Sequence, residues 1–150
     1  AQAREKGVPV VLDGGSWKDG MAALLPLVDI AICSADFRPP AFPAERQPRQ
    51  ILEFLAGSGL RYGAITRGAQ PLRYFAGDER GEIPVERVPV VDTLGAGDIF
   101  HGAFCYAFAR EQDFTEALRS ATRIAARSCR FLGSRAWMDQ AVDLDLIIDT

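Results

Sequence analysis

The chain has 150 residues, a mass of 16.3 kDa and 48% hydrophobic residues, which is enough to bury the core of one domain or of part of one. Its 17 Lys and Arg residues against 20 Asp and Glu residues give a net charge of −3, so the basic excess that nucleic-acid binding usually requires is missing. Because no apolar stretch approaches the roughly 20 residues that cross a bilayer, we expect a soluble protein without nucleic-acid or membrane partners.

The start of the chain and its cysteines add two expectations. Residues 1–7 lack an initiator Met and the apolar core of a signal peptide, and are typical of the end of a helix, so we expect the chain to begin within a fold. Cys33, Cys105 and Cys129 are odd in number and contain no C-x-x-C pair, which disfavours a disulfide framework or a zinc knuckle. A reducing, cytoplasmic location is therefore expected, with Cys105 and Cys129 as small core residues or as walls of a nucleotide pocket.

The first half of the chain alternates short apolar, β-branched runs with helical patterns, which predicts a mostly parallel sheet covered by helices. The expected strands cover residues 8–12, 29–33 and 61–66, and the expected helices cover residues 17–27 and 50–56. Strand 8–12 should be buried on both faces. A proline-rich, irregular connection is expected over residues 37–48, and hairpin strands over 72–75 and 83–85.

Polar side chains mark the ends of these strands and helices. Ser16 and Asp19 resemble a capping box at the start of helix 17–27. Asp13, Ser34 and Thr66 follow the three parallel strands, whose carboxyl ends are where ligands bind in such sheets. Asp13 is accordingly either a site residue or a partner of the helix start.

The last third is helical. After a strand-like segment at residues 88–91, the run from Ile99 to Phe108 is so apolar that its helix should be buried almost all round. Asp113 and Glu116 form a second capping box, which predicts a helix running to about Leu132.

The segment Asp92-Thr-Leu-Gly-Ala-Gly-Asp98 is the most informative stretch of the sequence. At a helix start, the free N–H groups of Gly95, Ala96 and Gly97 would point at an anion with the helix dipole behind them. Asp98, in the first turn, could accept a proton from a hydroxyl beside this cradle. The pattern alone also permits a simpler interpretation, in which the glycines make a turn and Asp98 caps the helix.

Two common nucleotide motifs are excluded. Gly97 and Gly102 have the spacing of a P-loop, but Ala103-Phe104 replaces the Lys-Ser/Thr pair. The dinucleotide fingerprint is also absent, because Phe100 stands where its third glycine would be.

The string from Val91 to Asp98, with Phe100 and the segment 102–104, closely resembles the D-T-x-G-A-G-D signature of the ribokinase/PfkB carbohydrate kinases. The resemblance implies an α/β fold with a three-layer, mostly parallel, ribokinase-like sheet, of which only the C-terminal half is present. Residues 1–150 would then be the nucleotide-binding part of the kinase domain. The N-terminal half with the sugar-contacting strands and the β-lid has no counterpart in this sequence.

The family's roles transfer to matching positions. Asp98 would be the catalytic base, and the amides of Gly95, Ala96 and Gly97 would form the anion hole for the γ-phosphate. Thr66 and Gly68 match the T-x-G segment along the ATP phosphates. The implied ligands of a monovalent cation, K⁺, are Asp92 and the carbonyl of Leu94, with further carbonyls from residues 127–133. That last segment places two more residues, Cys129 and Gly133, beside the nucleotide.

Two departures from the family pattern concern the phosphates and the metal. The usual N-x-x-E is replaced by Ser34-Ala-Asp-Phe37, so Asp36 is either a hard oxygen for Mg²⁺ through waters or a turn residue. Pro71 replaces the second glycine of the T-x-G loop. Arg67 and Arg73 could donate to phosphate oxygens, or be ordinary surface arginines.

The function predicted from this resemblance is ATP-dependent phosphorylation of a hydroxyl on a sugar or related alcohol, with Mg²⁺. The alternative is a non-catalytic nucleotide-binding or assembly fragment. The fragment alone should lose turnover, because the half that orients the sugar is missing. Its exposed sheet edge predicts association, for example as a homodimer. For His101, Trp17 and Trp137 we expect packing roles, with His101 alternatively facing the site from one turn beyond Asp98.

Overall fold

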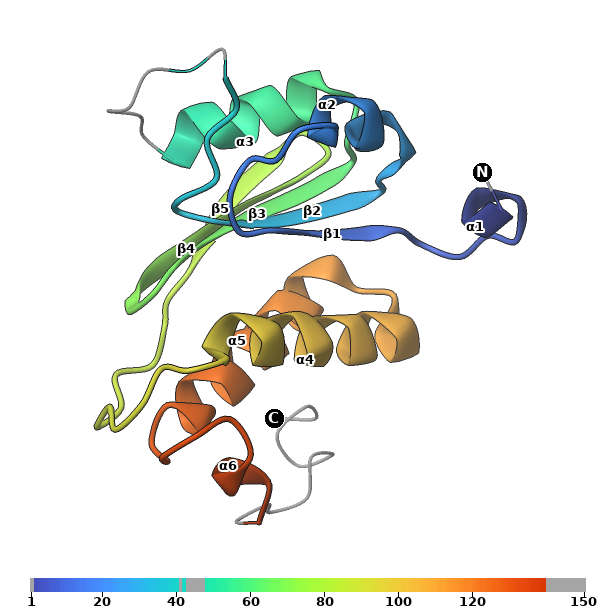
Figure 1. Ribbon diagram of the computed structural model, residues 1–150. Coiled ribbons are helices and arrows are strands. Elements are labelled where there is room, and N and C mark those ends of the chain that lie inside the picture. Colours follow the sequence, from blue (N-terminus) through green and yellow to red (C-terminus); the bar gives the residue numbers. More distant parts are fainter. Residues whose placement is uncertain (1, 41, 43–47, 140–150) are drawn as a thin grey trace. The chain divides into compact units, whose positions relative to one another are not determined.

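The computed structural model describes residues 2–40, 42 and 48–139. It divides into two compact units, Ala1–Ile83 and Pro84–Thr150, which are described separately. The elements of the first unit are α1 Gln2–Glu5, β1 Val11–Gly14, α2 Met21–Leu24, the 3₁₀ helix η1 Leu25–Leu27, β2 Ile30–Ser34, α3 Pro48–Gly57, β3 Tyr62–Arg67, β4 Gln70–Ala76 and β5 Glu79–Ile83. Those of the second unit are α4 Ala96–Glu111, α5 Phe114–Ser128 and α6 Ala136–Asp139 (Figure 1).

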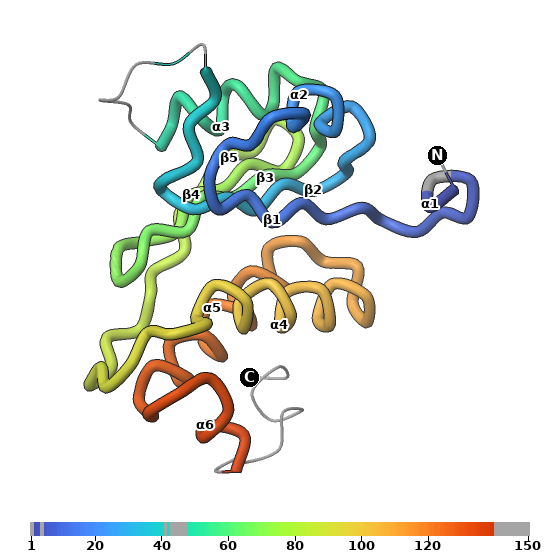
Figure 2. The backbone as a smooth tube through the Cα atoms, in the orientation of Figure 1, coloured from blue at the N-terminus to red at the C-terminus, as the bar shows by residue number. Residues whose placement is uncertain are grey.

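The first unit is built on a five-stranded sheet with the order β1-β2-β3-β4-β5. Strands β1, β2 and β3 are parallel, and β3, β4 and β5 are antiparallel. Helices α2 and α3 lie over the same face of this sheet (Figure 1), and the tube in Figure 2 shows β4 returning alongside β3. The predicted α/β class, with parallel strands followed by a hairpin, is confirmed.

The register of the parallel strands brings their carboxyl ends together. Ser34 pairs with Thr66, and Gly14 pairs with Cys33. Strand β2 is buried along four of its five residues, as expected for a central parallel strand. The predicted edge carrying Ser34 and Thr66 is therefore confirmed as one edge of the sheet.

The core of the first unit joins α3 to the sheet. Ile51, Leu52 and Leu55 of α3 are buried in one cluster with Cys33 of β2 and Phe75 of β4. Leu55 is fully buried, which stabilises the fold by about 1.5–3 kcal/mol. The i, i+1, i+4 spacing of these residues explains why the segment forms a helix with one apolar face.

Strand β1 differs from the prediction in position and burial. It begins at Val11 rather than Val8, and Val11 and Leu12 are only half-buried while Asp13 is exposed. The expected burial on both faces is wrong, because β1 is an outer strand in the sheet order of the described residues.

Helix 17–27 is also shorter than predicted. It begins at Met21 after Gly20, whose φ of 86° is left-handed, and no side chain caps it. Ser16 and Asp19 therefore do not form the expected capping box. The helix ends in the 3₁₀ turn η1, which holds Pro26 in its first residues, where a missing N–H costs no helical hydrogen bond.

The second hairpin strand covers residues 79–83 instead of 83–85. Ala76 pairs with Glu79, so the connection is the two-residue loop Gly77-Asp78, with Gly77 at φ 59°. Arg73 and Glu82 pair across the strands at 2.6 Å. This charged segment lacks apolar alternation, and cross-strand pairing decides its structure.

In the second unit, α4 and α5 pack through aromatic rings. Phe104 stacks on Phe108 with a centroid distance of 5.6 Å and meets Phe114 of α5 edge-on at 5.8 Å. Tyr106 and Cys105 are exposed, so the predictions that α4 is buried all round and that Cys105 is a core residue are wrong. Because phenylalanines recur every four residues, only one face of α4 is covered.

Of the remaining predictions for this unit, one is confirmed and others differ from the structure. The Asp113 cap is confirmed, since its side chain accepts a hydrogen bond from the Glu116 N–H at 2.9 Å. Helix α5 ends at Ser128, before the predicted end. Residues 88–91 form no strand, and Val90 and Val91 are exposed. The proline-rich connection includes residues 41 and 43–47, which lie outside the described residues.

None of the described helices has the length and apolar character needed to span a membrane.

Candidate active site

Asp92 ties the loop before α4 to the segment after α5. Its Oδ1 accepts a hydrogen bond from the Leu94 N–H, and its Oδ2 accepts one from the Gly133 N–H, each at 2.9 Å. The N–H groups of Val91 and Asp92 both donate to the Cys129 carbonyl, at 2.8 and 3.2 Å. The structure thus brings together four residues singled out in the sequence, Asp92, Leu94, Cys129 and Gly133.

These contacts also set the charge of Asp92. The Leu94 N–H, then the Gly133 N–H and the Thr93 N–H, lower the pKa of its carboxyl below the ordinary value of 3.8, because amide donors favour the ionised form. A carboxylate held in this way keeps lone pairs for a cation. The family resemblance implied that carbonyls of residues 127–133 lie beside Asp92. It did not predict the contact from the Gly133 amide, since no motif encodes an amide contact over 41 positions.

Helix α4 begins at Ala96, and Gly95 before it is the N-cap residue, at φ 75° and ψ 5°. The Ala96 N–H donates to the Thr93 carbonyl at 3.2 Å. Within the described part of the chain, the N–H groups of Gly95, Gly97 and Asp98 donate to no protein acceptor. Amides without acceptors at a helix start are typical anion-binding groups.

The two glycines of this turn have different structural needs. A Cβ on Gly95 would lie 3.2 Å from the Ser134 Cβ, and the left-handed φ would strain it further. A Cβ on Gly97 would meet nothing within 4 Å, and its backbone is helical. The fold therefore requires glycine at 95 but gives no reason for glycine at 97.

Asp98 lies in the first turn of α4 with an exposed side chain. No described residue forms an ion pair or hydrogen bond with its carboxylate. His101 Nδ1 lies 2.8 Å from the Gly97 carbonyl, and its ring packs edge-on against Phe100. This agrees with the packing role for His101, and leaves the Asp98 carboxylate available to a ligand.

In the first unit, Thr66 and Gly68 frame the turn from β3 to β4. The Thr66 hydroxyl donates to the Cys33 carbonyl at 3.4 Å. Arg67 pairs with Gln70 across the loop Gly68-Ala69, in which Gly68 has φ 59°. Pro71 lies in β4 rather than in this turn.

The segment Ser34–Phe37 contributes its aromatic ring to the core. Phe37 is fully buried and its ring lies 5.5 Å from that of Trp17. The Ser34 hydroxyl donates to the Gly15 carbonyl at 2.6 Å and accepts from the Asp36 N–H at 3.1 Å. The Asp36 backbone thus forms a turn, while its side chain is exposed.

Among the described residues, no group of three or more His, Cys, Asp and Glu side chains could hold a metal ion. Asp36 and Asp92 belong to different units.

Comparison with known proteins identifies the class. The family model of the pfkB family carbohydrate kinases matches residues 1–140. The chain belongs to this family.

Two bacterial sugar kinases are similar to this chain in sequence. Fructosamine kinase FrlD of Bacillus subtilis is 36% identical over 91 residues, covering 61% of this chain and 32% of that protein. Ribokinase of the same species is 45% identical over 74 residues, covering 49% of this chain and 25% of that protein. The chain thus spans at most about a third of these relatives.

A solved structure shares the fold. An E. coli protein described as a ribokinase II, in complex with ATP and Mg²⁺, superposes with a TM-score of 0.78 and 23% identity. The match covers 96% of this chain and 48% of that one. The fold described above is therefore ribokinase-like and corresponds to about half of that kinase.

Proposed function

We propose that this chain is the nucleotide-binding part of an ATP-dependent carbohydrate kinase that phosphorylates a hydroxyl of a sugar or related alcohol. The observation that carries the proposal is the start of α4, where the amides of Gly95, Gly97 and Asp98 have no described acceptor beside an exposed carboxylate. The family's printed description and the names of the relatives support the same class of substrate.

In the proposed reaction, the Asp98 carboxylate removes the proton from the acceptor hydroxyl. The resulting oxygen attacks the γ-phosphorus of ATP in line, the bond to the β-phosphate oxygen breaks, and ADP leaves. The amides of Gly95 and Gly97 donate to the γ-phosphoryl oxygens as negative charge develops on them in the transition state. The Ala96 amide joins them once its hydrogen bond to the Thr93 carbonyl breaks. Asp92 positions these amides, because its two hydrogen bonds fix the preceding loop.

The resemblance to the pfkB family assigns further nucleotide contacts to four residues. Thr66 and Gly68 would lie along the phosphates, and Cys129 and Gly133 beside the nucleotide. The helix-start amides would favour the phosphate end of ATP because the helix dipole adds to their partial charge.

Two cations enter the proposal through oxygen donors. Mg²⁺, bound chiefly by the ATP phosphates, would offset their charge, with Asp36 as the chain's own oxygen. Asp92 and the Leu94 carbonyl would hold K⁺, and the ionised state of Asp92 suits a cation. Both assignments use hard oxygen atoms, as these ions prefer.

A second candidate function is nucleotide binding without catalysis. Phe37, a buried core ring, stands where the family pattern has an acidic residue, so one expected carboxylate near the phosphates is missing. The two functions differ in whether Asp98 changes turnover.

The test uses Asp98→Asn in the kinase that contains this chain, with Asp78→Asn as control. Both positions are exposed aspartates, and Asp78 lies in the hairpin loop. We expect Asp98→Asn to lower kcat by about 10²–10⁴-fold and to keep ATP affinity, measured by calorimetry, while Asp78→Asn changes neither. Unchanged turnover in Asp98→Asn would refute its role as base, and ATP binding without turnover in the unmutated kinase would favour the second function.

A further inference from the structure

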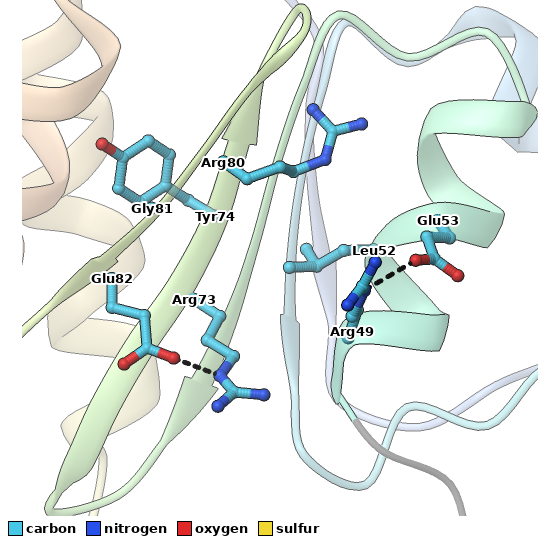
Figure 3. A pocket seen from close by; sticks show the side chains of 8 residues that line it. All are labelled: Arg49, Leu52, Glu53, Arg73, Tyr74, Arg80, Gly81 and Glu82. Atoms are coloured by element: carbon cyan, nitrogen blue, oxygen red, sulfur yellow. Dashed lines mark hydrogen bonds and ion pairs between the residues drawn. The ribbon is translucent and has the colours of Figure 1, made fainter.

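A pocket of about 550 Å³ opens between α3 and the hairpin of β4 and β5 in the first unit (Figure 3). This volume lies in the range of small-molecule sites. Its lining includes three arginines and two glutamates, namely Arg49, Arg73, Arg80, Glu53 and Glu82. None of these residues takes part in the proposed phosphoryl transfer.

The three arginines come from three different elements. Arg49 extends from α3, Arg73 from β4 and Arg80 from β5, and Figure 3 shows the two hairpin arginines on the side that faces α3. All three arginines line this one pocket, although they belong to three separate elements. The pocket charge is +1, from three arginines against two glutamates.

Two of the arginines, Arg49 and Arg73, each form an ion pair through their own Nε atom. Arg49 Nε bonds Glu53 Oε1 at 2.9 Å, and Arg73 Nε bonds Glu82 Oε1 at 2.6 Å. Within the described residues, the terminal NH₂ groups of Arg49 and Arg73 donate to no acceptor. Exposed ion pairs of this kind add little stability, but they orient the guanidinium groups and leave their paired terminal donors for a ligand.

Arg80 is held differently. Its Nη1 donates to the carbonyls of Gly77 and Glu79, at 2.7 and 2.9 Å, and its guanidinium lies 5.1 Å from the centre of the Phe75 ring. No described carboxylate pairs with it. Its charge is therefore not offset by a direct partner.

Leu52 gives the pocket an apolar wall. Leu52 belongs to α3, lines the pocket and is buried in the core. Because only 4% of Leu52 is exposed, a ligand gains little by covering it, and the arginine donors carry the recognition.

We propose that this pocket binds a small anion whose phosphate or carboxylate oxygens accept hydrogen bonds from the terminal NH₂ groups of Arg49 and Arg73 and from Nη2 of Arg80. Arginine suits this role because its planar donors match a phosphate or a carboxylate in pairs. Both anion types share this chemistry, and the experiment separates them.

The test titrates the kinase that contains this chain with glycerol 3-phosphate and, separately, with citrate, and follows the arginine Nε–H signals by NMR. Ionic strength is kept constant with chloride. We expect saturable shifts of the Arg49, Arg73 and Arg80 signals with at least one probe, and the probe that acts identifies phosphate or carboxylate as the ligand group.

Variants show whether the arginines carry the binding. Arg73→Gln and Arg80→Gln should each raise Kd at least about tenfold, equivalent to about 1.4 kcal/mol. Arg73→Lys keeps the charge but loses the paired donors, and should also weaken binding. Arg87→Gln, an exposed arginine of the other unit with the same change of charge, should leave Kd unchanged.

Shifts that chloride alone reproduces, or that grow without saturation, would overturn the proposal. So would saturable binding that survives both Arg73→Gln and Arg80→Gln, because the anion would then lie elsewhere. If Arg73→Gln does not fold, as judged by circular dichroism, Arg80→Gln and Arg73→Lys decide the question.

Discussion

Replacing Gly97 by alanine separates the needs of the fold from those of the proposed phosphate cradle. The added Cβ would meet nothing within 4 Å, and the backbone at Gly97 is helical. Gly→Ala at such a position stabilises a protein by about 0.4–1 kcal/mol. This should raise Tm by up to about 4 °C.

The same methyl group should be harmful to catalysis. It would stand next to an amide that has no described acceptor, in the space that the γ-phosphoryl oxygens occupy in the proposed reaction. Alanine keeps the amide N–H, but a methyl group that holds the phosphoryl oxygen away from it would have the effect of losing one donor, which lowers kcat by about 10²–10³-fold, or about 2.7–4 kcal/mol of transition-state stabilisation. We therefore expect a variant that is more stable and nearly inactive.

The assay combines thermal unfolding with steady-state phosphorylation in the kinase that contains this chain. Gly102→Ala is the matched control, because Gly102 lies in the same helix and its Cβ would also meet nothing within 4 Å. It should gain similar stability and keep its activity. Equal activity in Gly97→Ala and Gly102→Ala, or a large loss of stability in Gly97→Ala, would refute the reasoning.

Three further predictions concern stability and ionisation. Gly63→Ala should lower the free energy of unfolding by about 1–3 kcal/mol in urea titrations, because its Cβ would collide with the Phe75 ring. Asp92, whose pKa is lowered, contributes stability above pH 3.8 that is lost as pH falls through its lower folded value, so the Gly133 amide signal should titrate with a midpoint below 3.8. Burial raises the pKa of the Cys33 thiol to about 12, so Cys33 should resist a thiol reagent at pH 8 while the exposed Cys105 reacts. The free energy of unfolding should fall between pH 9 and 12, because over this range only the thiol of the unfolded chain ionises.

Each of these predictions has an opposing result. Gly15→Ala, whose Cβ would meet nothing within 4 Å, should be neutral, and an equal loss in Gly15→Ala and Gly63→Ala would contradict the collision with Phe75. A Gly133 midpoint at or above 3.8 would contradict the Asp92 contact. Rapid labelling of Cys33 in the folded chain would contradict its burial.

Local patterns predicted the elements whose structure depends on their own residues. The apolar runs of β2 and β3 and the Asp113 cap of α5 are encoded within a few positions, and the structure confirms them. The helix start at Gly95 is also local, because a left-handed residue there favours glycine.

The remaining features depend on partners that are distant in the sequence. Strand β5 is charged and is fixed by pairing with β4, which no apolar pattern indicates. Phe37 is buried in the core, where its ring packs against Trp17, twenty positions earlier in the sequence. The Asp92 contact with the Gly133 amide uses a backbone group, so no side-chain motif could predict it.

The most direct test of the account is the amide spectrum of the kinase as ATP and Mg²⁺ are added. We predict that the Gly95, Gly97 and Asp98 N–H signals move together and saturate with the same Kd as ATP binding, since these amides would donate to its phosphate. ATP binding that leaves these three signals unmoved would contradict it.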